Sequence, residues 1–498
     1  MTDFGSLDFC SDERNLHVMF RRRRQLYLFL FLATALAASY AQVTAPDTSV
    51  VSSPYPPLFK SAKYAVGAGP VSIVVADFNG DGKPDIATAN RDASTVSILI
   101  NNGDGTFQKH VDYATGKSPA QVVVGDFNND GTADLAVANN GDPSISILLG
   151  NGDGTFRPRI DTFVSPTDGA YTLSAYDLDN DGRLDLVVGP ADFSLLGNGD
   201  GTFQAPVRFH LYYGGTLSYV LVTRLNGLDL VGVMNDFFPY KIEEFVAKGG
   251  GTWLNDSEWW SNQTGHLGQL AAGDINGDNL GDIAASWFGE NEVFVCLSNS
   301  DGILNCGNSY KVGTGPIGIA LADLTGDNLL DVVTANSGSN NISFLRGHGD
   351  YTLGARTNYA VGKVPESVAV ADFDSNGRQD LAVANSGDGT VTTLLQSTVA
   401  LSTFSLSFGK QAVGTTSPAK TVTLFNAGLS TLHISKVSIS GDFSLQSNGC
   451  GTTLASGASC KLSVVFKPTV AGTRTGGLFV ADDALRSPQT ISLSGKGI

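Results

Sequence analysis

Asp77-Phe-Asn-Gly-Asp-Gly-Lys-Pro-Asp85 decides the fold of this chain, because close variants of this nine-residue stretch recur along it. The later copies begin at Asp126, Asp177, Asp274, Asp323 and Asp372. Their starts are 49 or 51 residues apart, except for one interval of 97 residues that leaves room for a degenerate seventh copy around residues 223–229. A period of this length, with short strands and glycine turns, is typical of a β-propeller with one four-stranded blade per repeat.

Each repeat has room for four strands. In the unit from residue 122 to 167, strand-forming runs precede a Gly-Asn-Gly-Asp-Gly-Thr-Phe turn that leads into a fourth run. The last unit ends after three strands at Gln396, whereas residues 58–67 resemble a fourth strand and precede the first unit. We therefore expect residues 58–67 to pair with the last blade and to cover its open edge.

Beyond residue 397 the acidic loops stop and the pattern changes. Residues 401–498 contain alternating strands such as 420–425, 462–466 and 490–494. About a hundred residues of short antiparallel strands suit an immunoglobulin-like sandwich. The predicted fold class is all-β, a seven-bladed β-propeller over residues 58–397 followed by an immunoglobulin-like β-sandwich over residues 401–498.

The N-terminus has the pattern of an export signal. Four arginines at 21–24 precede a short apolar run at 25–38 and a small-x-small site at 39–41. We expect residues 1–41 to be an extension and signal peptide, with translation starting at Met1 or Met19, and residues 42–57 to be a linker. An uncleaved membrane anchor is the alternative, although the run is short for a span. No membrane span is expected in the mature chain.

Composition limits the partners. The 498 residues carry a net charge of −17 and only 16% charged residues. There is no basic stripe outside residues 21–24, so a nucleic-acid partner is not expected. Beyond Cys10, the cysteines form two pairs ten residues apart, Cys296 with Cys306 and Cys450 with Cys460. An even number in an exported chain predicts two disulfides, and ligation of a metal by four cysteines is the less favoured alternative.

The acidic loops place oxygen-bearing side chains at alternate positions 1, 3, 5 and 9, and a chemically variable residue at position 7 that suits a backbone carbonyl ligand. Position 6 is glycine or asparagine throughout, which suits a left-handed turn. Hard oxygen ligands on a tight loop indicate Ca²⁺, so we expect up to six structural ions. The residues at positions 1, 3, 5, 7 and 9 are Asp77, Asn79, Asp81, Lys83 and Asp85; Asp126, Asn128, Asp130, Thr132 and Asp134; Asp177, Asp179, Asp181, Arg183 and Asp185; Asp274, Asn276, Asp278, Leu280 and Asp282; Asp323, Thr325, Asp327, Leu329 and Asp331; and Asp372, Asp374, Asn376, Arg378 and Asp380.

Two other interpretations of the loops are less favoured. Asx turns would use the same residues without a metal, but they do not explain carboxylates at positions 1 and 9 of all six loops. An EF-hand is excluded, because position 12 of the first loop is Thr88 and the flanking segments are strands.

These loops, with their Val-Ala-Asp-Phe-Asn entries and Asn-Gly-Asp-Gly-Thr-Phe turns, resemble the FG-GAP/VCBS repeat family, which includes the propeller of integrin α subunits. The resemblance covers residues 58–396 and implies a calcium-stabilised propeller used for extracellular recognition. The fourth unit departs from it, retaining only Asn226 and Asp229, so no ion is expected there. The tail, with Leu406-Ser-Phe-Gly and Gly449-Cys-Gly, is similar to bacterial choice-of-anchor D (ASPM/HYDIN-like) domains.

No enzyme is predicted, because the chain lacks an H-E-x-x-H motif and a G-x-S-x-G element on a strand-to-helix turn. We expect a secreted or cell-surface recognition protein, bacterial by resemblance, that binds an extracellular protein or glycan. The alternative is a secreted carbohydrate-active enzyme, a lyase or hydrolase with its site at the propeller channel.

All four tryptophans lie between residues 253 and 287, within or beside the degenerate unit. Trp253 and Trp287 are expected to pack in the core, because they lie in or next to strand-like segments. Trp259 and Trp260 lie in a polar run that suggests an irregular, exposed loop, and are possible ligand contacts. The alternative is that these rings fill a poorly packed blade interface.

Overall fold

The computed structural model describes residues 53–498, except 166–168, 190–192, 209–216, 224–228, 235–240, 250–251, 261–266, 300–303, 429 and 486. Between residues 209 and 266 it describes the backbone of the strands alone. The predicted extension, signal peptide and most of the linker lie outside the described residues. So do Asn226 of the degenerate loop and the turn between Cys296 and Cys306.

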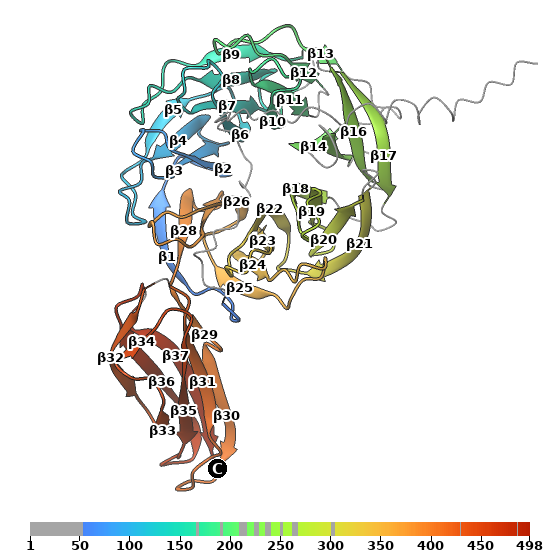
Figure 1. The fold of residues 1–498 in the computed structure, drawn as a ribbon. Helices are drawn as coiled ribbons and strands as arrows, with labels where there is room; N and C mark the ends of the chain where they lie inside the picture. Colours follow the sequence, from blue (N-terminus) through green and yellow to red (C-terminus); the bar gives the residue numbers. More distant parts are fainter. Residues whose placement is uncertain are drawn as a thin grey trace, which may run out of the picture. The chain divides into compact units, whose positions relative to one another are not determined.

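Residues 59–396 form seven four-stranded antiparallel sheets, arranged around a ring in Figure 1, and no helix occurs among the described residues. The fold class predicted from the periodic loops is therefore confirmed as all-β. The strands, sheet by sheet, are β2 (Pro70–Ala76), β3 (Asp85–Asn90), β4 (Thr95–Leu99), β5 (Val111–Ala114); β6 (Pro119–Gly125), β7 (Asp134–Asn139), β8 (Ser144–Leu148), β9 (Ile160–Phe163); β10 (Thr172–Tyr176), β11 (Asp185–Gly189), β12 (Phe193–Leu195), β13 (Val207–Arg208); β14 (Leu217–Thr223), β15 (Asp229–Met234), β16 (Lys241–Gly249), β17 (Thr252–Trp260); β18 (Leu267–Gly273), β19 (Asp282–Trp287), β20 (Glu292–Ser298), β21 (Leu304–Lys311); β22 (Pro316–Ala322), β23 (Asp331–Asn336), β24 (Asn341–Leu345), β25 (Thr357–Ala360); and β26 (Pro365–Ala371), β27 (Asp380–Asn385), β28 (Thr390–Gln396), β1 (Phe59–Ala65).

The acidic loops join the first and second strands of six of these sheets. The second strand is buried along its length in all six, as in β3 and β7, because the sheet carries neighbouring sheets on both faces. Its sequence is accordingly a run of Ala, Val, Ile and Leu rather than a polar and apolar alternation. The loop is thereby anchored at its C-terminal end by a strand with almost no freedom to move.

The ring closes as the sequence predicted. Strand β1 pairs antiparallel with β28, with Phe59 opposite Gln396 and Ala65 opposite Thr390. A second contact joins the first and last sheets, since the Gly105 amide donates to the Phe373 carbonyl at 3.0 Å.

That second contact repeats between other sheets. The glycine-rich turn after the third strand of one sheet donates a backbone hydrogen bond to position 2 of the preceding acidic loop, as Gly154 does to Phe78 at 2.8 Å. The rings of Phe78 and Phe156 also meet edge to face, with centroids 5.6 Å apart. The acidic loops are therefore joints between neighbouring sheets as well as turns within one sheet.

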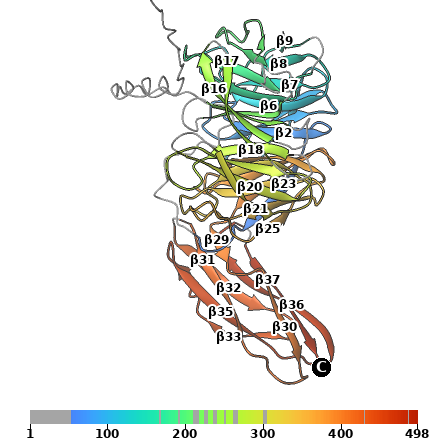
Figure 2. The same cartoon turned by 90° about the vertical axis from the view of Figure 1, so that its right-hand side faces the viewer.

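The C-terminal domain consists of two sheets, which Figure 2 shows from the side. Its core includes Phe466, Val464 and Leu478, all of which are buried. One pairing differs from the predicted antiparallel pattern, because β30 runs parallel to β37. The strands are β29 (Val399–Leu401), β31 (Lys420–Asn426), β35 (Ser459–Phe466) and β33 (Phe443–Asn448) in one sheet, and β30 (Ser405–Gln411), β37 (Gln489–Gly497), β36 (Gly472–Asp482), β32 (Leu432–Ile439) and β34 (Thr453–Leu454) in the other.

Both predicted disulfides are present. Cys296 of β20 lies opposite Cys306 of β21, and the two are bonded. Cys450 and Cys460 are bonded within the sandwich, with Cα atoms 5.0 Å apart.

The tryptophan segment departs from the prediction. Trp259 and Trp260 end strand β17 and pair with Ile242 and Lys241 of β16, so their backbone is a regular strand and not an irregular loop. The polar run misled the prediction because polar side chains do not by themselves exclude a strand. Trp287 is buried, as expected, and lies 5.6 Å from the ring of Phe294.

Candidate metal centres

Position 1 of each acidic loop organises the loop backbone. In the first loop, Asp77 Oδ1 accepts from the amides of Gly80 and Asp81, at 2.7 and 3.1 Å, and Oδ2 accepts from Gly82 at 2.7 Å. The bonds from positions 5 and 6 recur in all six loops. These are Asx-turn bonds, and they leave a further lone pair on Oδ2, which accepts one amide.

Left-handed backbone is required at two positions in each loop. Position 6 has a positive φ in every copy, as predicted from its glycine or asparagine. Position 4 also has a positive φ throughout, which sequence reasoning missed although glycine or asparagine occurs there in five copies. The values are 79, 82, 85, 65, 62 and 81° at Gly82, Gly131, Gly182, Asn279, Asn328 and Gly377, and 72, 56, 59, 79, 77 and 57° at Gly80, Asn129, Asn180, Gly277, Gly326 and Ser375.

Position 9 has a structural role that the sequence did not reveal. Asp85 is fully buried, and its two oxygens accept backbone amides of Phe78 at 3.0 Å and Asn101 at 2.7 Å. The same pair of bonds holds position 9 in the other five loops. This carboxylate therefore ties the loop to the end of the third strand. Its presence in all six copies was the available signal.

Burial destabilises the ionised form of the carboxylate at position 9. It raises the pKa to about 6 in Asp85, to about 7 in Asp134 and to about 8 in Asp380, against the lowering effect of the amide donors. The neighbouring carboxylates of the same loop raise it further. A cation within the loop would offset both effects, because an opposite charge favours the ionised form.

Three carboxylates converge in two of the loops. Asp177, Asp179 and Asp185 each offer an oxygen within 4.8 Å of the others, and so do Asp372, Asp374 and Asp380. Burial, followed by the charge of Asp372, raises the pKa of Asp374 to about 6. Hydrogen bonding within an Asx turn gives no reason for three like charges to converge. The donor set therefore fits a hard divalent cation, which the carboxylates at positions 1, 3 and 9 would hold. Position 5 and the carbonyl of position 7 remain ligands predicted from the sequence.

The other four loops replace the position-3 carboxylate by an amide or hydroxyl oxygen. Asn79 Oδ1 accepts from the Asp81 amide at 3.0 Å, and Asn128 and Asn276 make the same bond. Each of these four loops carries three carboxylates, as the Asp372 loop does, whereas the Asp177 loop carries four.

The Asp323 loop has its own cationic neighbours. Arg346 donates to Asp327 at position 5, at 2.7 Å, and both side chains are mostly covered. Arg378, buried, donates to the Leu324 carbonyl at 3.2 Å. The Thr325 hydroxyl at position 3 is buried and has no hydrogen-bond partner among the residues that the structure describes.

The comparisons with known proteins identify both parts of the chain. A model described as FG-GAP-like repeat matches residues 77–137, 126–188 and 323–383, and a model described as HYDIN/CFA65/VesB-like, Ig-like domain matches residues 398–496. The chain therefore contains FG-GAP-like repeats followed by an Ig-like domain, as the resemblance predicted. No curated protein sequence matches the chain.

Solved structures give more distant likenesses. BBS1N in complex with ARL6DN is 14% identical, covers 70% of this chain and 97% of its own, and has a TM-score of 0.49. A protein from Lactobacillus plantarum is 12% identical, with coverages of 62% and 98% and a TM-score of 0.47. The ASH/PapD-like domain 7 of human CEP192 is 20% identical, with coverages of 20% and 85% and a TM-score of 0.17.

FG-GAP-like repeats joined to an Ig-like domain are a combination typical of extracellular adhesion or recognition proteins. The two disulfides are consistent with an oxidising compartment. Among the described residues, no helix is long and apolar enough to cross a membrane.

Proposed function

We propose that this chain is a secreted or surface-attached, calcium-binding recognition protein. Its propeller is the platform that binds an extracellular protein or glycan, and its sandwich is a spacer or attachment module. The observation that carries the proposal is the convergence of three carboxylates in the loops at Asp177 and Asp372.

Calcium supplies charge compensation and a fixed loop shape. The acidic loops accept backbone bonds from the glycine-rich turns of neighbouring sheets, as at Phe78 and Phe127. An ion that fixes a loop would therefore also fix the junction between two sheets. This couples calcium to the rigidity of the platform, and a rigid platform loses less entropy when it binds a partner.

The hydrogen bonds that the loop carboxylates accept favour a binding role over a catalytic role. All those at positions 1 and 9 accept backbone amides within their own sheet or loop, so they serve structure. A glycoside hydrolase instead presents two carboxyl groups to a sugar. We therefore propose a non-enzymatic role.

The test is a calcium count on the purified mature chain by equilibrium dialysis and mass spectrometry. Asp374→Asn should lower the affinity of one site, because position 3 loses its charge. Asp153→Asn is the matched control, because this exposed aspartate caps the Gly-Asp-Gly-Thr turn through Thr155 and belongs to no acidic loop. Absence of bound calcium at millimolar concentration would contradict the ion assignment.

The recognition role needs a separate readout. A glycan and protein binding array, run with a polysaccharide-degradation screen, should return specific binding without turnover. Degradation of a polysaccharide would overturn the non-enzymatic role.

A further inference from the structure

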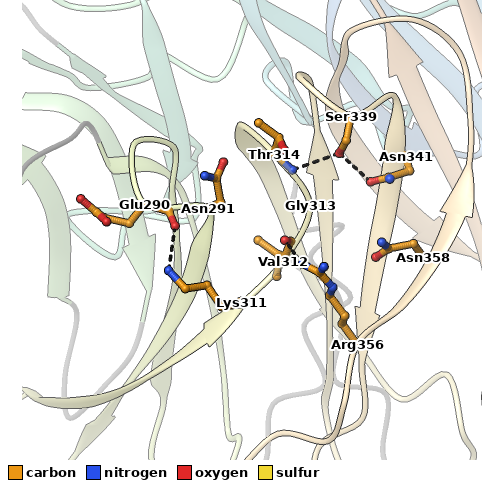
Figure 3. Close-up of a pocket in the computed structure, with 10 residues that line it drawn as sticks. All are labelled: Glu290, Asn291, Lys311, Val312, Gly313, Thr314, Ser339, Asn341, Arg356 and Asn358. Carbon is orange, nitrogen blue, oxygen red and sulfur yellow. Dashed lines mark hydrogen bonds between the residues drawn. The ribbon is translucent and has the colours of Figure 1, made fainter.

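A polar pocket lies at the strand ends opposite the acidic loops. We call this side of the sheets the turn end, because it carries the turns from second to third strands. The pocket has a volume of about 380 Å³ and lies between the sheets β18–β21 and β22–β25 (Figure 3). Its lining includes Arg356, Asn358, Lys311, Thr314 and Ser339.

A repeat elsewhere in the ring shows what the Arg356 position normally does. In the sheet β6–β9, Arg159 occupies the equivalent place, and its guanidinium donates to the Thr115 carbonyl. Arg159 Nε also donates to Asp161 Oδ2 at 3.0 Å, while Asp161 Oδ1 accepts from Ser146 at 2.8 Å. The arginine charge is thus neutralised two residues along its own strand.

The repeat that contains the sheet β22–β25 has the arginine but lacks the aspartate. Arg356 donates to the Val312 carbonyl, the counterpart of Thr115, but residue 358 is asparagine. Among the ion pairs of the described residues, Arg356 takes part in none. Arg356 and Asn358 are both exposed.

The orientation of the Asn358 amide follows from its neighbours. Ser343 Oγ accepts from the Gly313 amide at 2.9 Å and from Asn336 Nδ2 at 2.9 Å, so its proton goes to Asn358 Oδ1 at 2.9 Å. Asn358 Nδ2 therefore takes the place that Asp161 Oδ2 has in the other repeat. Two hydrogen-bond donors, the Arg356 guanidinium and Asn358 Nδ2, therefore lie where the other repeat pairs its arginine with a carboxylate oxygen.

We propose that this pocket binds a carboxylate-bearing sugar unit of an acidic polysaccharide, whose carboxylate takes the place of the missing Asp161 oxygens. Arginine suits this role because its planar donors match a carboxylate. The proposal rests on the recognition function above and gives it a ligand class.

The rest of the lining favours a sugar. Five of the ten lining residues are asparagine, serine or threonine, and Val312 is buried, so the lining itself offers no apolar subsite for a peptide side chain. The carboxylate of Glu290, which also lines the pocket, points away from Arg356 (Figure 3). Phe288 is 43% exposed, and its ring lies beside Gly315, next to Thr314 of the lining. An exposed aromatic ring at a polar pocket suits the apolar face of a sugar ring. Lys311 is already paired with Glu292, at 2.7 Å, which leaves Arg356 as the cation for the ligand.

The experiment is calorimetric titration of the mature chain, in calcium, with trigalacturonate and with its fully methyl-esterified form. The acid is negatively charged and the ester is neutral, whereas the two have nearly the same shape. We expect the acid to bind at least about tenfold more tightly than the ester, as a charge-assisted hydrogen-bond pair requires. Equal binding, or no binding of the acid at millimolar concentration, would overturn the proposal.

Two variants and one control assign the binding to Arg356. Arg356→Gln removes the charge, and Asn358→Asp restores the internal partner that Arg159 has, so each should weaken trigalacturonate binding at least about tenfold. Arg159→Gln should leave it unchanged, because that guanidinium is already paired. Unchanged binding in both pocket variants would overturn the assignment. If Arg356→Gln still bound the ligands found on the array, recognition would take place at another site. The pocket assignment can therefore be contradicted while the proposed recognition function is retained.

Discussion

The acidic loops at Asp177 and Asp323 come from one sequence motif but differ in how far their charged side chains are covered. Asp179 and Asp181 of the first loop are exposed, and three of its carboxylates converge. The Asp323 loop is largely covered, and Arg346 donates to its Asp327 at 2.7 Å. Its neighbours include the Ser53 amide, which donates to the Thr325 carbonyl at 2.8 Å.

The difference shows that a repeated loop does not define a repeated electrostatic environment. In the Asp177 loop Arg183 lies 3.3 Å from Asp181, with both side chains partly exposed, so this pair balances little of the convergent negative charge. In the Asp323 loop the mostly covered pair of Arg346 and Asp327 balances part of the charge. The four predictions below test this contrast, from the largest expected effect to the smallest.

Deletion of residues 58–66 should abolish stable folding of the propeller. The variant loses β1, which leaves β28 with an unpaired edge beside the Asp323 loop, where Gln396 donates to the Leu324 carbonyl at 2.8 Å. Size-exclusion chromatography and thermal melting should show aggregation and no cooperative transition at the wild-type temperature. Deletion of residues 42–52 is the control and should be tolerated; equal behaviour of the two truncations would refute the closing role of β1.

Removal of calcium should lower the melting temperature by many degrees. With sites of about 10⁻⁴ M affinity and about 1 mM free ion, each ion would contribute roughly 1.4 kcal/mol, so six independent ions could contribute roughly 8 kcal/mol. Calorimetry in excess chelator measures the effect, and re-addition of Ca²⁺ should restore the wild-type temperature. Unchanged melting in chelator would show that the loops are balanced without an ion.

Asp185→Ala should destabilise the chain by about 3 kcal/mol even in chelator. The variant leaves the buried amides of Leu178 and Gly197 without a hydrogen-bond acceptor, because each donates to Asp185 at 2.7 Å. Chemical denaturation with and without calcium measures both parts of the effect. Asp181→Ala, at the exposed position 5, is the control, and its cost should be small once the ion is removed. A loss seen only in calcium would mean that position 9 is purely a metal ligand.

Arg346→Ala should cost about 1 to 2 kcal/mol, because it leaves the mostly covered Asp327 without its partner. Arg157→Ala is the matched control, since Arg157 lies 3.5 Å from Asp130, which is also at position 5, with both side chains more exposed. That change should cost less than about 0.5 kcal/mol. Equal effects in urea denaturation would remove the distinction between the covered and the exposed loop.

The sequence allowed much of the structure of the acidic loop to be predicted, because the loop is local. The repeated pattern predicts its oxygen spacing and the left-handed residue at position 6. The phase of the repeat also predicts that residues 58–67 pair with the last sheet. The role of position 9 was missed because its partners, such as Asn101 for Asp85, belong to another strand. The strand at Trp259 was missed because its polar pattern carries no core signal.

What the sequence by itself determined is the repeating unit: its period, its four strands, its acidic loop and the two cysteine pairs, since each depends on residues close together in the chain. Tertiary structure alone decided how each copy is used. It covered the pair of Arg346 and Asp327 on one loop and left the pair of Arg183 and Asp181 on another exposed. It also brought Arg356 and Asn358 together in one pocket. Charge balance and burial depend on neighbours that are distant in sequence, and for that reason related motifs have different electrostatic environments.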